Sequence, residues 1–286
     1  MTRTHWSVIA LLLFVAVAVS VVSPRRSATA DAPGTLLEAV KKRGTVRAGI
    51  RFDNPPHSFI DERGRWMGFD VDIAEAVAKQ LEVQIEKVKV DELTRISYLK
   101  TGQIDMAVAS MSHTIKRDQE IDFSVTYFWS KQTFLVKKGQ IKSLADLVGK
   151  RVGMSRGSHS IGNWRNWLKP HGHAAPPEIV EFASKQAAVE AVRQGAIAGW
   201  AEDYEVVGAF AKRDASLAVL GDEGIGMKQD GIGVRENDSK WRDAVNFALQ
   251  RLTASGEYER IYERWFGPAS DTPIPRQGEI EIWPNG

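Results

Sequence analysis

The segment Gly68 to Leu81, GFDVDIAEAVAKQL, combines a glycine, two carboxylates and a helical pattern of apolar residues. Its apolar residues recur at the spacing of one face of an α-helix. They are Phe69, Ile73, Val77 and Leu81, with Ala76 beside them. Two carboxylates, Asp70 and Asp72, fall in the expected first turn, where the helix dipole favours negative charge. The stretch predicts an amphipathic helix that begins after a glycine turn and packs against a core.

The N-terminus has the layout of an export signal. A short basic start precedes an apolar run from Val8 to Val22, and Ala28 to Ala30 then offers a small-residue cleavage site. This order predicts a secretory signal peptide over residues 1–30. The run is shorter than the roughly 20 residues that span a bilayer. Arg25 and Arg26, just after the run, leave an uncleaved anchor open as the alternative. No second apolar run of that length follows, so we expect the remainder to be soluble.

The absence of cysteine and the charge balance exclude several classes. With no cysteine in the chain, disulfides, thiolate chemistry, a cysteine zinc site and a lipid-modified cysteine anchor are ruled out. A freely diffusing exported protein must be retained, which points to a periplasm between two membranes. Residues 1–30 hold three arginines and no acid, so without them the formal net charge changes from +2 to −1. Such a charge gives no reason to expect nucleic acid or a membrane surface as partner.

Beyond residue 45, short apolar runs alternate with amphipathic stretches. Alternation of this kind is typical of an α/β protein with mainly parallel sheets. The expected strands are residues 45–50, 83–90, 104–110, 151–155, 178–183 and 197–201, and the further expected helices are 93–102, 161–169 and 185–195. About 255 mature residues is more than one core usually holds, so two domains are expected.

An internal echo supports two similar domains. Residues 99–110 align with residues 192–203, and each segment has the pattern of a helix end, a glycine C-cap and a buried strand. A chance match between two such common units is the alternative. If the echo is real, Ser110 and Asp203 end equivalent strands. Ligands in open α/β sheets bind beyond the carboxyl ends of strands, so these two residues are expected to face a shared cleft.

As a whole string, residues 68–81 resemble the signature of the solute-binding proteins of ABC importers, in the family that captures polar amino acids. That family's pattern is glycine, an aromatic or aliphatic residue, acid, aliphatic, acid, aliphatic and a spaced apolar tail, and each constrained position is met here. The resemblance implies a two-lobe type II periplasmic binding protein fold, an α/β fold whose lobes are mainly parallel sheets flanked by helices and joined by a two-strand hinge. It places the crossings near residues 129–131 and 228–231. Lobe 1 is then residues 31–130 and 229–286, and lobe 2 is residues 131–228.

The resemblance also implies how the backbone of an amino acid would be held. A zwitterion needs a bidentate cation for its carboxylate and an anion for its ammonium. The run from Ser110 to Arg117, SMSHTIKR, resembles the family's segment in which two hydroxyl residues and an arginine embrace the ligand. Carried over, Arg117 takes the α-carboxylate, and Ser110 and Ser112 add backbone and hydroxyl contacts. Taken alone, Arg117 is a solvated arginine near a helix start, where a cation gains nothing from the dipole.

Lobe 2 would add contacts from its first βα turn and from a strand end. Ser158 fits the turn, because N–H groups at a helix N-terminus attract an anion, although it could simply be an N-cap. The family usually has threonine or serine at the next position, whereas this chain has His159, whose contact would depend on pH. Asp203 is the counterpart for the ammonium, or alternatively a cap for the helix that starts at Tyr204.

The ligand's side chain is harder to infer. The resemblance places Arg51 and Arg95 where the family reads that side chain, and two arginines there look like its glutamate and aspartate binders. Lys185, which opens a helix, would add a third positive contact. Glu92 disagrees, because a carboxylate repels an acidic ligand. Paired with Arg51 or Arg95, Glu92 would leave room for a neutral ligand such as glutamine or asparagine. Phe52 is the nearest aromatic that could line the pocket, and a core position explains it equally well.

The expected function is therefore extracytoplasmic capture of a polar amino acid, with an acidic one favoured, and its delivery to the permease of an ABC importer. We expect a periplasmic monomer with no catalytic residue, cofactor or metal. One rival is a dehydratase of cyclic prephenate-type or arogenate-type acids on the same scaffold, for which Glu92 is the only candidate proton donor. Another is a sensor or adaptor that binds the ligand without transport. His171 and His173 flank a glycine in a loop and fit exposed positions better than metal ligation.

Overall fold

The computed structural model describes residues 34–171, 178–221 and 224–284. The predicted signal peptide and His173 lie outside these residues. Within them, no helix is long and apolar enough to cross a membrane.

The segment 68–81 contains α2 (Phe69–Gln80), the amphipathic helix predicted from the sequence. Phe69, Ile73 and Val77 on its apolar face are fully buried. Gly68 precedes the helix with a φ of 130°, and a Cβ atom there would lie 2.2 Å from the carbonyl oxygen of His57. Only glycine adopts this backbone conformation without strain. The glycine turn therefore sets where the helix begins and how closely it approaches the segment around His57.

Two sets of parallel strands carry the flanking helices, and the expected strands and helices are confirmed in type and order. The first set is β1 (Thr45–Arg51) between β5 (Gln84–Val90) and β6 (Met106–Ala107). Its helices are α1 (Leu36–Arg43), α3 (Arg95–Lys100) and α4 (Ile115–Asp118). The second set is β8 (Val152–Ser155) between β10 (Gly199–Asp203) and β9 (Ile179–Phe182). Its helices are α5 (Ser160–Leu168), α6 (Lys185–Gln194) and α7 (Tyr204–Arg213).

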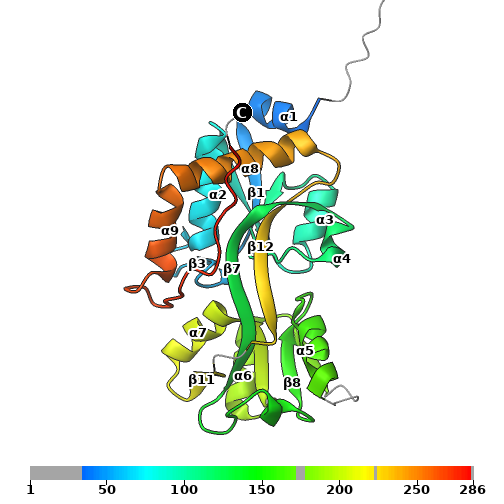
Figure 1. The fold of residues 1–286 in the computed structure, drawn as a ribbon, viewed down its shortest axis with the longest axis vertical. Coiled ribbons are helices and arrows are strands. Elements are labelled where there is room, and N and C mark those ends of the chain that lie inside the picture. Colours follow the sequence, from blue (N-terminus) through cyan, green and yellow to red (C-terminus); the bar gives the residue numbers. More distant parts are fainter. Residues whose placement is uncertain (1–33, 172–177, 222–223, 285–286) are drawn as a thin grey trace, which may run out of the picture. The chain divides into compact units, whose positions relative to one another are not determined.

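Two long strands join these sets into one mixed sheet. They are β7 (Asp122–Lys137) and β12 (Gly226–Val234), which pair antiparallel and run side by side between the two groups of elements in Figure 1. The strand order is β5-β1-β6-β12-β7-β10-β8-β9, and β11 (Leu217–Val219) also pairs with β7. Ser130 lies opposite Lys228 in this ladder. The two predicted crossings are thus adjacent strands.

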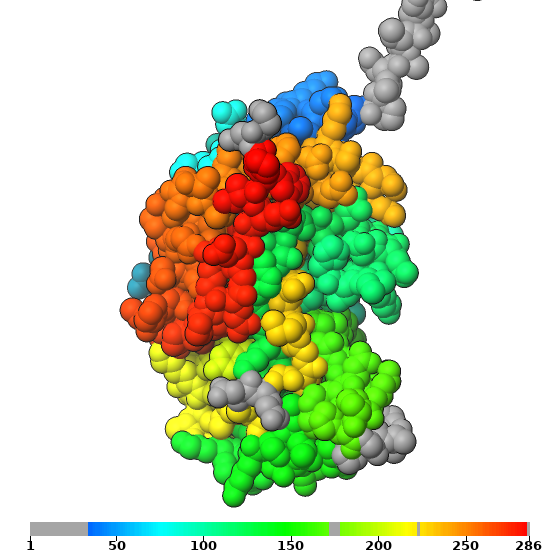
Figure 2. Space-filling view, viewed as in Figure 1, coloured from blue at the N-terminus to red at the C-terminus, as the bar shows by residue number. Residues whose placement is uncertain are grey.

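The buried apolar residues form separate clusters on the two sides of this ladder. Two clusters draw only on residues 40–128 and 232–280, and two others only on residues 134–225. The C-terminal helices α8 (Ser239–Ala254) and α9 (Glu257–Phe266) belong to the first group. So does the small sheet of β2 (Asp53–Asn54), β3 (Ser58–Ile60) and β4 (Trp66–Met67), through Trp66. The segment after α9, red in Figure 2, lies over the same helices and buries Ile274 and Ile280 there.

Candidate functional site

The carboxyl ends of the parallel strands supply most of the predicted site. Arg51 is the last residue of β1, Asp203 is the last residue of β10, and Glu92 follows β5. Within each set, parallel strands place their carboxyl ends on one edge, where open α/β sheets bind ligands. The set of β1 and the set of β10 run in opposite directions in the mixed sheet. The predicted equivalence of Ser110 and Asp203 is only approximate, because β6 ends three residues before Ser110.

Two buried guanidinium groups lie close to residues 109–112. Arg117 is only 8% exposed, so it is not the solvated arginine of the alternative interpretation. Its Nη1 donates to the carbonyl of Ser112 at 2.8 Å and its Nη2 to the carbonyl of Gly157 at 3.3 Å. Arg95 Nη1 donates to the carbonyl of Ala109 at 2.7 Å. Within the described residues, neither guanidinium has a carboxylate within 4.0 Å.

These two arginines are unusual because buried charges are normally paired. Burial, followed by the repulsion of Arg95, lowers the pKa of Arg117 to about 9. Burial also lowers the pKa of Arg95, and the Nε of Arg95 has no hydrogen-bond partner in the part of the chain that the structure describes. The pair therefore presents positive charge and free donor capacity that an anion could satisfy.

The two predicted hydroxyl residues lie beside these arginines and are already engaged by the protein. Ser110 has a φ of 51°, a left-handed conformation that is uncommon outside glycine. Its Oγ accepts a hydrogen bond from Lys228 Nζ at 3.1 Å. Ser112 Oγ donates to Asp230 Oδ1 at 3.2 Å. The turn of the backbone at Ser110 brings both side chains towards β12.

Of the three cations expected to read the ligand's side chain, Arg51 and Lys185 are paired with carboxylates, whereas Arg95 is not, among the described residues. Arg51 forms ion pairs with Asp53, at 2.8 Å, and with Glu92. Lys185, the first residue of α6, pairs with Glu202 and lies 3.8 Å from Glu92. Burial alone would raise the pKa of Glu92, but Arg51, Lys185 and Arg95 outweigh it and lower this pKa to about 2. Glu92 therefore stays ionised, and the predicted pairing of Glu92 with an arginine is observed at Arg51.

The turn after β8 differs in detail from the expectation. Helix α5 begins at Ser160, so its N-cap is His159, which makes no side-chain capping bond. Ser158 Oγ instead accepts from the backbone N–H of Ser160 at 3.1 Å. Burial lowers the pKa of His159 to about 4, with only partial compensation from Asp203. His159 is therefore neutral near pH 7, and a pH-dependent contact would require acid conditions.

Asp203 directs its carboxylate into the site and away from the helix that it precedes. It is the N-cap residue of α7 but makes no side-chain capping bond, which rules out the capping alternative. Its Oδ1 accepts from Gln132 Nε2 at 3.1 Å, and its Oδ2 lies 2.8 Å from Lys228 Nζ. The carboxylate of Asp203 is thus near enough to Arg117 and Arg95 to favour their charged forms, and Lys228 already contacts it.

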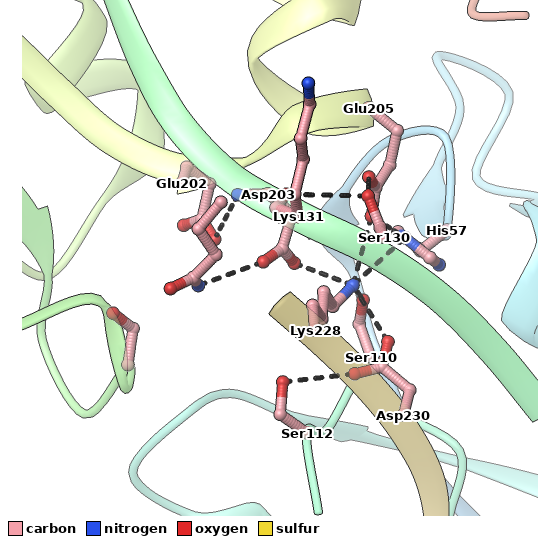
Figure 3. A network of polar contacts seen from close by, with 12 residues as sticks. His57, Ser110, Ser112, Ser130, Lys131, Glu202, Asp203, Glu205, Lys228 and Asp230 are labelled. Carbon is pink, nitrogen blue, oxygen red and sulfur yellow. Dashed lines mark hydrogen bonds and ion pairs between the residues drawn. The ribbon is translucent and has the colours of Figure 1, made fainter. Parts of the chain in front are cut away.

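The sequence prediction missed the group of charges around Lys228. Figure 3 shows the Lys228 ammonium among the carboxylates of Asp203, Glu205 and Asp230. Glu205 also pairs with His57 Nε2 at 2.6 Å. All of these side chains are buried. One signal was available, because Lys228 and Asp230 are two residues apart on a strand and therefore share a face.

Two further candidates lie away from this group. Phe52 is 40% exposed, with Lys89 Nζ 5.8 Å from its ring centre, so the core explanation for Phe52 is wrong. His171 is exposed and stacks on Trp167, with 4.0 Å between ring centres.

Comparison with known proteins assigns the chain. Residues 46–268 match the sequence profile of the bacterial extracellular solute-binding proteins, family 3. The chain belongs to this family. The structure has the type II periplasmic binding fold, with a mixed sheet and flanking helices, as do solved members of the family.

Relatives and solved structures agree with this assignment. The chain is 29% identical over 238 residues to the L-cystine-binding protein TcyJ of Escherichia coli (strain K12), covering 81% of this chain and 86% of the relative. It is 30% identical over 235 residues to the glutamine-binding protein GlnH of Bacillus subtilis (strain 168), covering 80% and 84%. An ancestral arginine-binding protein solved with glutamine is 36% identical, with a TM-score of 0.71 over 79% of this chain and 99% of that one. An ancestral amino acid-binding protein described as a precursor of cyclohexadienyl dehydratase is 30% identical, with a TM-score of 0.71 over 81% and 99%.

Proposed function

We propose that this family 3 protein captures a free α-amino acid outside the cytoplasm and delivers it, as a monomer, to the permease of an ABC importer. The observation that carries the proposal is a pair of buried guanidinium groups, Arg117 and Arg95, that have no carboxylate within 4.0 Å among the described residues, with the carboxylate of Asp203 near enough to act on both charges. A zwitterion supplies the missing anion to the arginines and a cation to Asp203. The names of the relatives, which bind cystine, glutamine and arginine, support the same ligand class.

We propose that the ligand lies between two lobes, residues 31–130 with 229–286 and residues 131–228. The separate core clusters on the two sides of the β7–β12 ladder support this division. The bond from Arg117 to the Gly157 carbonyl and the pair of His57 with Glu205 both run from one proposed lobe to the other. Opening of the lobes would break such contacts and admit the ligand, and closure would complete its polar contacts.

For the ligand's side chain, we propose a neutral polar group such as the amide of glutamine. The acidic preference inferred from the sequence depends on positive charge at Arg51 and Arg95, with Lys185 as a third contact. Our proposal assigns Arg95, together with Arg117, to the ligand's α-carboxylate, which leaves Arg51 and Lys185 for its side chain. Each of these cations already has a carboxylate partner. One of these partners is Glu92. Burial would raise the pKa of Glu92, but Arg51, Lys185 and Arg95 outweigh it and lower this pKa to about 2, so the carboxylate stays negative. A glutamate or aspartate side chain would have to displace one of these carboxylates. The acidic preference is the alternative outcome of the same binding experiment.

We propose that the protein is a binder and has no dehydratase activity. The dehydratase interpretation needs Glu92 to donate a proton to a leaving hydroxyl. Because the pKa of Glu92 is about 2, this carboxyl is ionised near neutral pH and has no proton to donate. Transport and sensing share this binding step, and a permease and an ATPase encoded next to the gene would favour transport.

A thermal-shift screen tests the proposal. Purified protein is heated with each common amino acid and, separately, with prephenate and arogenate. A ligand that binds only the folded state raises the melting temperature. We expect a rise with glutamine or asparagine and a smaller rise with glutamate or aspartate. A larger rise with the acidic pair would restore the sequence-based preference, whereas no rise with any amino acid, together with turnover of prephenate or arogenate, would overturn the proposed function.

A further inference from the structure

Lys228 is a buried lysine whose ammonium lies among three carboxylates. It belongs to β12 and has no exposed surface. Its Nζ lies 2.8 Å from Asp203 Oδ2, 2.8 Å from Asp230 Oδ2 and 3.0 Å from Glu205 Oε1. Burial opposes the charge, but Asp203, Asp230 and Glu205 outweigh it and hold the pKa of Lys228 well above its usual value. Lys228 is thus a permanent cation inside the protein.

This cation contacts the carboxylate that the proposed function assigns to the ligand's ammonium. Asp203 Oδ2 contacts Lys228, and Asp203 Oδ1 accepts from Gln132. The opposite end of the site is different, because Arg117 and Arg95 bond only to backbone carbonyl groups among the described residues. The protein therefore gives Asp203 an internal cation, which Asp203 shares with Asp230 and Glu205, and leaves Arg117 and Arg95 without a carboxylate partner among the described residues.

The charges around Lys228 do not change this difference between Asp203 and the two arginines. His57 lies 2.6 Å from Glu205 and 3.5 Å from Asp70, so it is a cation shared by these two carboxylates, of which only Glu205 also contacts Lys228. Burial of His57 and the repulsion of Lys228 oppose its charge, but Asp70 and Glu205 outweigh them and raise the pKa of His57 to about 9. Asp203 and Asp230 have no cation other than Lys228 within 4.0 Å among the described residues.

We propose that Lys228 is a specificity-determining residue that substitutes for the ligand's α-ammonium, so that the site accepts 2-hydroxy acids as well as the corresponding α-amino acids. This inference rests on the proposed function and names a wider ligand class for the same site. The carboxylate of either ligand meets Arg117 and Arg95. A hydroxyl, which both donates and accepts, can occupy the position of the ammonium without leaving Asp203 unpaired.

Calorimetric titration of the wild-type protein with glutamine and with 4-carbamoyl-2-hydroxybutanoate tests the inference directly. We expect the two dissociation constants to agree within about tenfold, since Asp203 keeps its contact with the Lys228 ammonium whichever ligand is bound. If glutamine binds and the hydroxy acid binds more than about 100-fold more weakly, this inference fails and the proposed function stands. If neither these ligands nor any other amino acid binds, the proposed function fails as well.

Substitution of Lys228 provides a second test of the inference. In Lys228→Met, Asp203 and Asp230 lose their internal cation, so the ammonium of glutamine should become essential and the preference for glutamine over the hydroxy acid should widen by at least about tenfold. Lys228→Arg should keep the wild-type ratio. If Lys228 had only a structural role, Lys228→Met would weaken the binding of both ligands equally and leave the ratio of the two affinities unchanged. That result would also contradict the inference.

Lys131 offers a matched control on the adjacent strand. It pairs with Met227 in the β7–β12 ladder, and in Figure 3 its side chain points away from Lys228. Its Nζ lies 5.1 Å from the ring centre of Tyr204. Lys131→Met removes a lysine from the same ladder without touching Asp203 or Asp230, and we expect it to leave the ratio of the two affinities unchanged. Should Lys228→Met fail to fold, the wild-type titration still decides the matter.

Discussion

At the scale of single residues, the charges of the site separate into paired and unpaired groups. The sequence singled out Arg117, Asp203 and the opposing charge of Glu92 as candidates, because each lies in a motif or at a strand end. It could not identify the contact of Lys228 with Asp203 and Glu205, because these residues are distant in the chain and meet only through sheet pairing. Local patterns carry no information on such long-range pairs.

Removal of the Arg117 guanidinium tests the residue that is expected to hold the carboxylate. We expect Arg117→Ala to weaken amino acid binding by at least about 30-fold, since loss of a buried charged partner costs about 2 kcal/mol or more. Stability should change little, because burial of this charge is itself unfavourable. Calorimetry and urea unfolding check both statements. Arg65→Ala removes an exposed arginine paired with Asp61 and is the control, and equal losses in both variants would contradict the assignment.

The raised pKa of His57 predicts how stability depends on pH. The pKa is about 9 in the folded protein and about 6.5 when unfolded, so the folded state binds the extra proton between these values. The stabilisation is complete below pH 6.5 and is lost as the pH rises to 9, with a fall of about 3 kcal/mol in the free energy of unfolding. Urea unfolding across this range measures the fall. A constant or rising free energy would show that His57 is neutral in the folded protein.

At the scale of elements, the sequence predicted the type and order of strands and helices because each has its own periodicity and glycine punctuation. Residues 68–81 and the echo around Gly102 and Gly195 are examples, and both glycines have a left-handed φ, of 71° and 74°. The length of β7 and the mixed character of the sheet were not predicted. Both depend on which strands pair, and β7 pairs with three strands that lie far from it in the sequence.

Gly68 offers a test of the turn that sets the start of α2. We expect Gly68→Ala to lower the free energy of unfolding by about 3 kcal/mol or more, because it combines an unfavourable φ with a clash against the His57 carbonyl. Gly64→Ala is the matched control. Gly64 also has a positive φ, of 76°, but nothing lies within 4 Å of its added Cβ, so we expect a loss of about 1 kcal/mol. Similar losses at both positions, measured by urea unfolding, would mean that the close contact is relieved at no cost.

At the scale of the whole molecule, the described contacts between the proposed lobes imply a change of shape with ligand. The bond from Arg117 to the Gly157 carbonyl and the pair of His57 with Glu205 cannot persist in a wide-open form. We expect small-angle X-ray scattering to give a smaller radius of gyration with glutamine than without it, and no such change in Arg117→Ala. An identical radius with and without bound glutamine would argue against closure.

A calorimetric comparison of glutamine with glutamate on the wild-type protein tests whether the site prefers a neutral polar amino acid to an acidic one. We expect glutamine to bind and glutamate to bind at least about tenfold more weakly, because Arg51 and Lys185 already have carboxylate partners. We expect Arg117→Ala to weaken the binding of both ligands by at least about 30-fold. Tighter binding of glutamate would contradict the charge assignment of the site. Unchanged binding in Arg117→Ala would contradict the site itself.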